Sequence, residues 1–365
     1  MLNLAQLKAS APALRLITFD ADGTLYNDGA HVEQDALIIA KLISLLDAGV
    51  HVAIVTAAGY PGEEARFEQR LAGLLDAFRD RRVSAAAAAR FHVMGGEVGA
   101  LNFVSIPCVC HSDFSLLLLL SRPQCNYLLR ASADGRLSFV PPDEWQLPEQ
   151  RAWTEEEARA PTLLSPFKTS LLSTAELRAL PPSPQITALL DAAQDALLAE
   201  AARLRMPVVL IRKPRAAGVV PTGRGVIYEM LEELALGVQH ALAGAPLPHC
   251  CFNGGGDVFV DVGNKSLGLQ ALQRYVGASP PTVRAKRGSP PPRLALSSRL
   301  AHPTVLSQVL HVGDRFTITG NDSMTRTTSP ILWVACPEET TFFISLLLSD
   351  IRARPRLRAQ VATAV

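Results

Sequence analysis

The chain has 365 residues, 48% of them hydrophobic and 19% charged, so it can bury a large core and lacks the composition of a disordered protein. Its 35 basic and 34 acidic side chains nearly cancel, so no global charge attracts nucleic acid or an anionic membrane. The longest apolar run, residues 116–120, is too short to cross a bilayer, and the six cysteines show no C-x-x-C spacing. No basic-then-apolar leader opens the sequence, so we expect a cytoplasmic protein. The length predicts two domains, or one domain with a large insertion.

The first third of the chain predicts the strand, helix and strand of a parallel sheet. Residues 14–19 predict a buried strand, residues 31–48 have a helical apolar rhythm that stops at Gly49, and residues 50–55 predict a second buried strand. Elements in this order imply a right-handed crossover between parallel neighbours. A further helix is expected over 63–78.

The middle of the chain loses this rhythm. Strands are expected in the segments FHVMGGE, CNYLLR and MPVVLIRKPRAAGVV. Helices are expected near 155–160, 174–180, 186–206 and 225–242. This mixture predicts an inserted α+β domain over 81–245.

The pattern of parallel strands returns in the last third, in the segments DVFVDVGNKSLGLQAL, LSQVLHVGDRFTITGND and PILWVACP. Ligand sites of open α/β sheets lie at the carboxyl ends of the strands, so residues 12–80 and 246–340 are expected to form one core with one site. Residues 279–298, rich in proline and basic residues, predict a disordered loop. Residues 98–124 are either a flexible loop or foreign sequence in the gene, and the sequence does not decide whether the tail 341–365 folds.

Two acids end the first predicted strand, in the segment DADGT. Asp20 and Asp22 occupy outward positions just past the strand, and Gly23 can take a tight turn. A carboxylate held there can bind Mg²⁺ and attack phosphorus, while its neighbour transfers a proton. Acids at a strand end are also a common solvated surface feature, so this motif alone leaves both interpretations open.

Three further segments support the catalytic interpretation. Thr56 ends the second strand and can hold a phosphate oxygen. Lys265, in VGNKSLG, can neutralise charge on a transferring phosphoryl group. Asp314 and Asp322, in GDRFTITGND, offer further carboxylates to a metal ion. Each residue would be ordinary in isolation, but four chemistry-bearing positions in this order predict a single site.

The order of these four motifs resembles that of the haloacid dehalogenase superfamily of phosphotransferases. A narrower set is similar to the IMP-specific 5′-nucleotidases, namely FDADGTLYNDG, VTAAGY, VMGGE with CNYL, RKPRAAGVVP, CFNGGGDVFVDVGNKSLG and HVGDRFTITGND. This resemblance implies an α/β fold, a Rossmann-like parallel-sheet core with an inserted α+β cap domain. It also implies Mg²⁺-dependent hydrolysis of the 5′-phosphate of inosine monophosphate (IMP) through an aspartyl phosphate.

Roles for the motif residues follow from the same resemblance. Asp20 would be the nucleophile and a metal ligand, and Asp22 the general acid and base as well as a metal ligand through its carbonyl. Asp314 and Asp322 would complete the metal site, and Lys265 would act on the phosphoryl group.

The expected substrate contacts are side chains that can bind phosphate or hydroxyl groups: Thr56, Asp28, Asp257, Asp261, Lys213 and Arg215. The resemblance implies that Asp28 is a candidate to contact the ribose. Lys213 and Arg215 can either meet the substrate when the cap closes or form a basic surface turn. The glycines before Asp257 permit close backbone approach, although this acid can equally be a turn residue.

Two other functions remain open. Fold and motifs determine the reaction better than the leaving group, so a phosphatase for other nucleotides or for sugar phosphates is one alternative. A non-catalytic scaffold with the same fold is the other. No nucleic acid or membrane partner is expected, and the sequence does not decide between a monomer and a homo-oligomer, or whether nucleotides regulate the chain.

Overall fold

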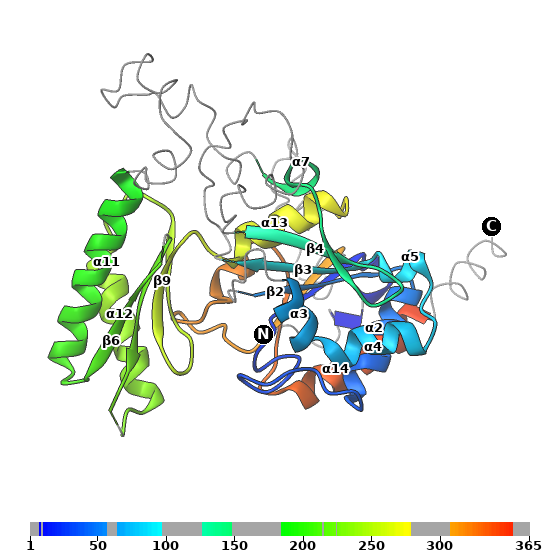
Figure 1. Cartoon of the computed structure of the whole chain (residues 1–365), viewed down its shortest axis with the longest axis horizontal. Coiled ribbons are helices and arrows are strands. Elements are labelled where there is room, and N and C mark those ends of the chain that lie inside the picture. Colours follow the sequence, from blue (N-terminus) through cyan, green and yellow to red (C-terminus); the bar gives the residue numbers. More distant parts are fainter. Residues whose placement is uncertain are drawn as a thin grey trace, which may run out of the picture.

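The computed structural model places two sheets beside each other, a larger one with helices on both faces and a smaller one with two long helices (Figure 1). The structure describes residues 7–8, 10–56, 64–96, 126–147, 184–213, 215–223, 225–278 and 307–352. No helix among these residues is both long and apolar enough to span a membrane.

The larger sheet has seven strands in the order β11-β10-β1-β2-β3-β4-β5. Their bounds are β1 Leu16–Phe19, β2 His51–Val55, β3 Phe91–Gly96, β4 Asn126–Ala131, β5 Leu137–Phe139, β10 Val309–Gly313 and β11 Ile331–Trp333. Strands β11, β10, β1, β2 and β3 are parallel, and β4 and β5 extend the sheet by antiparallel pairing. Central parallel strands are covered on both faces, which is why β1 and β2 are nearly continuous apolar runs.

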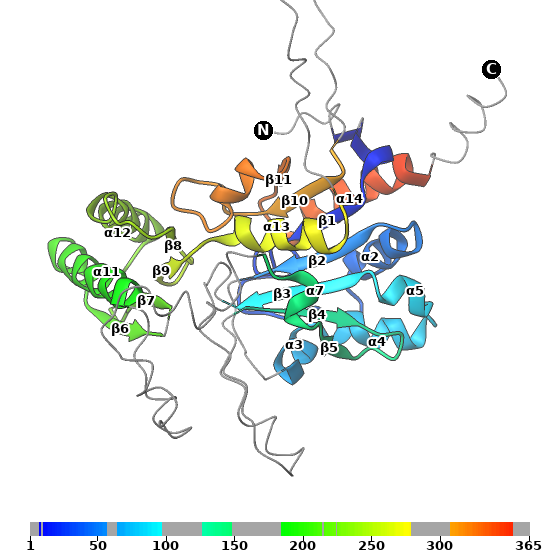
Figure 2. The same cartoon turned by 90° about the horizontal axis from the view of Figure 1, so that it is seen from above.

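Two apolar layers enclose this sheet, because alternate residues of a strand point to opposite faces. Ile17 and Val52 join the cluster that packs on α2 (Leu37–Asp47), α4 (Ala72–Asp80) and α14 (Pro337–Arg352). Leu16 and Ala53 join the cluster on the other face, under α13 (Lys265–Tyr275) and α7 (Pro142–Trp145). In the view from above, α13 lies across the sheet (Figure 2). The remaining short helices are η1 Ala11–Ala13, α3 Glu64–Arg70, α5 Ala85–Ala88 and η3 Ser323–Thr327.

The smaller sheet is antiparallel throughout, in the order β6-β7-β9-β8. Its strands are β6 Val208–Arg212, β7 Ala216–Pro221, β8 His249–Asn253 and β9 Val258–Val262. Helices α11 (Pro184–Arg203) and α12 (Tyr228–Ala241) cover one face and form an apolar cluster of their own with it. These helices lie on the side of the sheet away from the larger sheet (Figure 1 and Figure 2).

The fold class expected from the sequence, a parallel-sheet α/β core with a separate α+β part, is confirmed. However, the sheets do not divide the chain at the expected domain boundaries, 81 and 246. Strands β3, β4 and β5 extend the larger sheet, although the sequence predicts residues 81–245 to be an insertion. Strands β8 and β9 complete the smaller sheet, although the sequence predicts residues 246–340 to belong to the core. The prediction that the segment DVFVDV is a parallel core strand is therefore wrong, since a short, mostly apolar strand does not encode its pairing direction.

One helical prediction needs correction, and the structure answers part of the question that the sequence leaves open about the tail. The helix expected over 63–78 is two helices, α3 and α4, which meet at Leu71. The tail after residue 340 folds as far as Arg352, because α14 packs through Ile344, Leu347 and Ile351 on the core. The insertion 98–124, the helices near 155–160 and 174–180, and the loop 279–298 lie outside the described residues.

Candidate active site

Three parallel strands end level with one another at one edge of the larger sheet. The register pairs Phe19 of β1 with Ile54 of β2 and with Val312 of β10. Asp20 follows β1 and Thr56 follows β2, so the two side chains leave neighbouring strands at the same edge. This is where open parallel sheets bind their ligands.

Three carboxylates meet at this edge. Oxygen atoms of Asp20, Asp314 and Asp322 all lie within 4.8 Å of one another, and Asp20 is only 5% exposed. Space for these acids depends on two glycines. A Cβ atom added at Gly23 would lie 2.5 Å from Oδ2 of Asp314, and one added at Gly313 would overlap Oδ2 of Asp322.

Lys265 joins two of these acids from the first turn of α13. Its Nζ lies 2.6 Å from Oδ2 of Asp20 and donates a hydrogen bond of 2.8 Å to Oδ1 of Asp322. The helix starts here because Asn264 caps it, accepting a hydrogen bond from the amide of Ser266. Burial alone would lower the pKa of Lys265, but Asp20 and Asp322 raise it to about 12. The lysine is therefore a fixed cation.

A buried hydrogen-bond chain holds Asp322 from behind. Nε2 of His311 lies 3.1 Å from Oδ1 of Asp322, and Nδ1 of the same ring lies 2.8 Å from Oγ1 of Thr18. Burial lowers the pKa of His311. Because a carboxylate only accepts hydrogen bonds, the neutral ring must carry its proton on Nε2. Lys265 and His311 together hold the pKa of Asp322 well below its usual range, despite burial.

The electrostatics of the other two acids favour a bound cation. Burial and the charge of Asp322 raise the pKa of Asp20 to about 7, although Lys265 acts in the opposite direction. Burial and Asp322 also raise the pKa of Asp314. A divalent cation among these oxygens would relieve the repulsion, and carboxylate oxygens are the ligands that Mg²⁺ prefers. The donor set therefore fits a hard metal ion.

Asp22 lies on the same turn but has other partners. Its two carboxylate oxygens each lie 3.2 Å from Nη1 of Arg70, and its Oδ1 accepts a hydrogen bond of 2.9 Å from the amide of Gly29. The side chain is therefore held apart from the three-acid cluster and can serve a different step. The predicted metal contact of its carbonyl stays a prediction.

Residues of the smaller sheet approach the site from the other side. Arg315 lies 3.8 Å from Oδ2 of Asp28 through Nη2, and burial raises the pKa of Asp257 while Lys213 and Arg315 lower it. Lys213 itself is exposed, with Nζ 4.7 Å from the centre of the Phe259 ring. Asp28 raises the pKa of Asp257 as well, so these three predicted substrate contacts lie near one another. That they touch a substrate stays a prediction.

Arg215 and Asp261 are buried at the level of β7 and β9, where Ala216 pairs with Asp261. Thr56 is also buried, and its amide donates a hydrogen bond of 3.0 Å to the carbonyl of Met94. The predicted contacts of these three side chains with the substrate stay predictions. Arg212, beside the predicted basic pair, instead forms an ion pair with Asp191 of α11.

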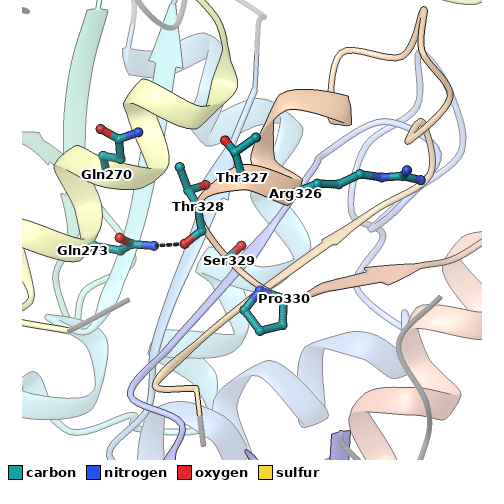
Figure 3. A pocket seen from close by; sticks show the side chains of 7 residues that line it. All are labelled: Gln270, Gln273, Arg326, Thr327, Thr328, Ser329 and Pro330. Carbon is teal, nitrogen blue, oxygen red and sulfur yellow. Dashed lines mark hydrogen bonds between the residues drawn. The ribbon is translucent and has the colours of Figure 1, made fainter. Parts of the chain in front are cut away.

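A cavity of about 560 Å³ lies elsewhere, between α13 and the segment from η3 to β11 (Figure 3). Polar side chains line most of it: Gln270, Gln273, Arg326, Thr327, Thr328, Ser329 and, as the one apolar residue, Pro330. Gln273 donates a hydrogen bond of 3.2 Å to the carbonyl of Thr328 across it. None of the residues predicted for the site lines this cavity.

Sequence reasoning missed three residues of the site, namely Arg70, His311 and Arg315. Arg315 directly follows an acid of the motif GDRF, and this adjacency is a signal that could have identified it. His311 lies inside an otherwise apolar strand, where a titratable group is unusual. Arg70, at the end of α3, has no such signal.

The site lies in a chain with clear relatives. A family model described as IMP-specific 5′-nucleotidase matches residues 1–105 and 157–344. The IMP-specific 5′-nucleotidase 1 of Aspergillus fumigatus is 37% identical over 350 residues, which cover 93% of this chain and 60% of that relative. That of Emericella nidulans is 33% identical over 386 residues, covering 93% and 68%. This chain thus spans less than two thirds of the length of the first relative.

A solved structure agrees with these sequence matches. The N-terminally truncated, IMP-bound IMP-nucleotidase of Plasmodium falciparum is 25% identical, with a TM-score of 0.63, over 96% of this chain and 71% of the other. The expected haloacid dehalogenase type of core is consistent with this neighbour. The three acids and their buried lysine thus lie in a chain that belongs to the IMP-specific 5′-nucleotidase family.

Proposed function

We propose that the chain hydrolyses the 5′-phosphate of IMP to give inosine and phosphate. The observation that carries this proposal is the buried contact of 2.6 Å between Lys265 and Asp20 beside the other two acids. A carboxylate beside a fixed cation and a metal-binding cluster is suited to attack phosphorus, because charge on the phosphoryl oxygens is neutralised where it develops. IMP as substrate is supported by the names of the relatives.

The reaction would take two steps. In the first, a carboxylate oxygen of Asp20 attacks phosphorus, the bond to the ribose 5′ oxygen breaks, and Asp22 gives that oxygen its proton. In the second, Asp22 takes a proton from water, which attacks the aspartyl phosphate and releases phosphate. Asp20 and Asp22 then regain their starting states. Lys265 stabilises the equatorial oxygens in both steps, and Arg70 holds Asp22 in place.

Mg²⁺ is the proposed cofactor, held by Asp20, Asp314 and Asp322 with the carbonyl of Asp22. When bound, it supplies positive charge to the phosphoryl oxygens and to the crowded acids. Both oxygens of Asp322 already accept hydrogen bonds, from Lys265 and from the amide of Arg315. Both oxygens of Asp20 are engaged as well, by Lys265 and by the amide of Ala21, whereas the contacts of Asp314 with Thr24 and Arg315 are longer, at 3.5 and 3.3 Å. Asp314 is therefore the best candidate for a direct ligand.

The smaller sheet with α11 and α12 is proposed to act as the cap. It spans residues 184–262 of the described chain and carries Lys213, Asp257 and Asp261. Asp28 and Lys213 both lie close enough to Asp257 to shift its pKa. These three side chains would bind the nucleoside, and Thr56 would bind the phosphate. We also propose a cytoplasmic location. Whether the chain is a monomer or a homo-oligomer can be measured from the mass of the purified protein in solution.

A substrate panel tests the proposal. Phosphate release by the purified chain is measured with IMP, AMP, GMP and a sugar phosphate, with Mg²⁺ and with a chelator. We expect release from IMP to be fastest, to stop on chelation and to return with added Mg²⁺. Equal rates on all substrates would replace IMP specificity by a broader phosphatase. A folded protein with no turnover would support the non-catalytic scaffold.

A further inference from the structure

The segment 314–322 supplies two of the three acids and is fastened to the smaller sheet. The amide of Asn253, at the end of β8, donates a hydrogen bond of 2.8 Å to the carbonyl of Thr319. Nε2 of Gln239, on α12, donates one of 3.0 Å to the carbonyl of Ile318. The backbone of this segment therefore follows the position of the smaller sheet.

Glu232 of α12 strengthens this attachment. Its Oε1 accepts a hydrogen bond of 3.1 Å from Nδ2 of Asn253, and its Oε2 accepts one from Oγ1 of Thr319. Asn253 and Thr319 are both fully buried. A carboxylate shared between two buried donors is a strong anchor, because charge-assisted hydrogen bonds are about twice as strong as neutral ones.

Arg315 connects this attachment to the metal cluster. Its Nε donates a hydrogen bond of 3.3 Å to Oδ2 of Asp314, and its Nη1 donates one of 3.1 Å to the carbonyl of Asn253. Nη2 lies 3.8 Å from Asp28, and the side chain is only 18% exposed. One rigid guanidinium thus contacts a cluster acid, the end of β8 and the predicted ribose contact.

The turn between β8 and β9 is shaped to admit this guanidinium. Gly255 has a φ of +97°, which only glycine adopts without strain, and its amide is held by the side chain of Asn253. A Cβ atom at Gly255 would overlap Nη2 of Arg315 and lie 2.9 Å from Nη1. Gly255 therefore leaves room for an arginine that follows β10 of the larger sheet.

We propose that Arg315 is a positioning residue, which sets the orientation of Asp314 according to how the smaller sheet docks on the core. The inference rests on the proposed function, since it requires a metal ion at the three acids. Docking of the smaller sheet and metal binding would then favour each other. Arg315 can orient Asp314 for the metal ion only while the carbonyl of Asn253, at the end of β8, accepts its hydrogen bond.

The test compares Arg315→Ala, Arg315→Lys and Gly255→Ala. Mg²⁺ binding is titrated calorimetrically, and the rise in melting temperature on adding Mg²⁺ is recorded beside kcat and KM. We expect Arg315→Ala to weaken Mg²⁺ binding about tenfold, as loss of an outer partner of a metal ligand does. Arg315→Lys should recover part of this loss. Gly255→Ala should weaken Mg²⁺ binding through the displaced guanidinium.

Two controls separate this mechanism from general damage. Gly225 has a similar φ of +89° with nothing within 4 Å of an added Cβ, so Gly225→Ala carries the backbone strain alone. Arg203 pairs with Glu200 and Glu233 on the surface of the helices, so Arg203→Ala removes an arginine elsewhere. Both should bind Mg²⁺ like the unmodified chain.

The double variant gives the decisive comparison. Arg315→Ala removes the group that an alanine at 255 would displace, so Mg²⁺ binding by the double variant should be no weaker than by Arg315→Ala alone. The inference is overturned if the double variant binds Mg²⁺ more weakly by the product of the two single effects, or if Arg315→Ala binds Mg²⁺ as tightly as the unmodified chain. Neither result would affect the proposed function. An unmodified chain that neither binds Mg²⁺ nor releases phosphate would overturn both.

Discussion

The ammonium group of Lys265 lies 2.6 Å from a carboxylate oxygen of Asp20, and both side chains are buried. The two residues come from opposite parts of the chain, one after a core strand and one at the start of α13. Their contact brings the candidate nucleophile to the position where a transferring phosphoryl group needs positive charge.

Asp20→Asn should abolish turnover and leave the fold intact. The amide keeps the shape of the side chain but is not a nucleophile, so the rate should fall by about 10⁴-fold or more. Phosphate release from IMP measures the loss, and the circular dichroism spectrum with the melting temperature provides the folding control. Substantial turnover in the folded variant would exclude Asp20 as nucleophile.

Lys265→Met should destabilise the protein, because it leaves Asp20 and Asp322 without their buried cation. Breaking a buried pair in this way costs about 3 kcal/mol of unfolding free energy, which urea denaturation can measure. Adding Asp322→Asn to this variant removes one uncompensated charge and should recover part of the stability. If Lys265→Met is as stable as the unmodified chain, the ion pairs contribute little to folding.

Arg70→Ala should lower kcat more than it changes KM. Without the guanidinium, Asp22 loses the contact that orients it for proton transfer, and kcat should fall on the order of 10²-fold. Arg70→Lys should retain part of the rate. Arg79→Ala, which removes a surface pair with Asp76, is the matched control and should be neutral. Equal losses in both alanine variants would show that the effect is not specific to Asp22.

The stacked imidazoles of His51 and His92 should make the fold sensitive to acid. Burial lowers the pKa of His92 to about 3 and that of His51 to about 4, so the unfolded chain binds more protons between these values and pH 6.5. Stability contributed by the neutral rings is therefore present above pH 6.5 and is lost as the pH falls. For His92 alone the loss at pH 5 is about 2 kcal/mol.

Urea denaturation from pH 7.5 to 5 tests this expectation in the unmodified chain and in His92→Gln. The variant should show a shallower loss of stability with falling pH than the unmodified chain. Asp20, whose raised pKa acts in the opposite direction over this range, is common to both proteins and cancels in the comparison. Identical slopes in His92→Gln and the unmodified chain would contradict the assignment.

Local pattern is sufficient to predict the centre of the larger sheet. The strands β1 and β2 and the helix α2 follow from apolar periodicity over a few residues, and strand ends in a parallel sheet must meet at one edge. Because Asp20 and Asp314 each follow a core strand, this geometry predicts that the two acids lie together, as they do.

The remainder depends on partners that local pattern does not encode. The strand β9 has the same apolar run whether its neighbours are parallel or antiparallel, so its membership of the smaller sheet was not predictable. Arg70 gains its role from Asp22, which lies opposite it in space but far from it in the sequence. A single arginine in a sequence carries no sign of such a partner.

Gly23, at a φ of +72°, leaves room for the carboxylate of Asp314, and Gly313, at the end of β10, leaves room for that of Asp322. A single additional methyl group at either position would push an acid out of reach of a cation without removing any charge. Metal binding by this chain can therefore be lost through small volume increases at uncharged positions. A mutational survey confined to acids and bases would overlook them.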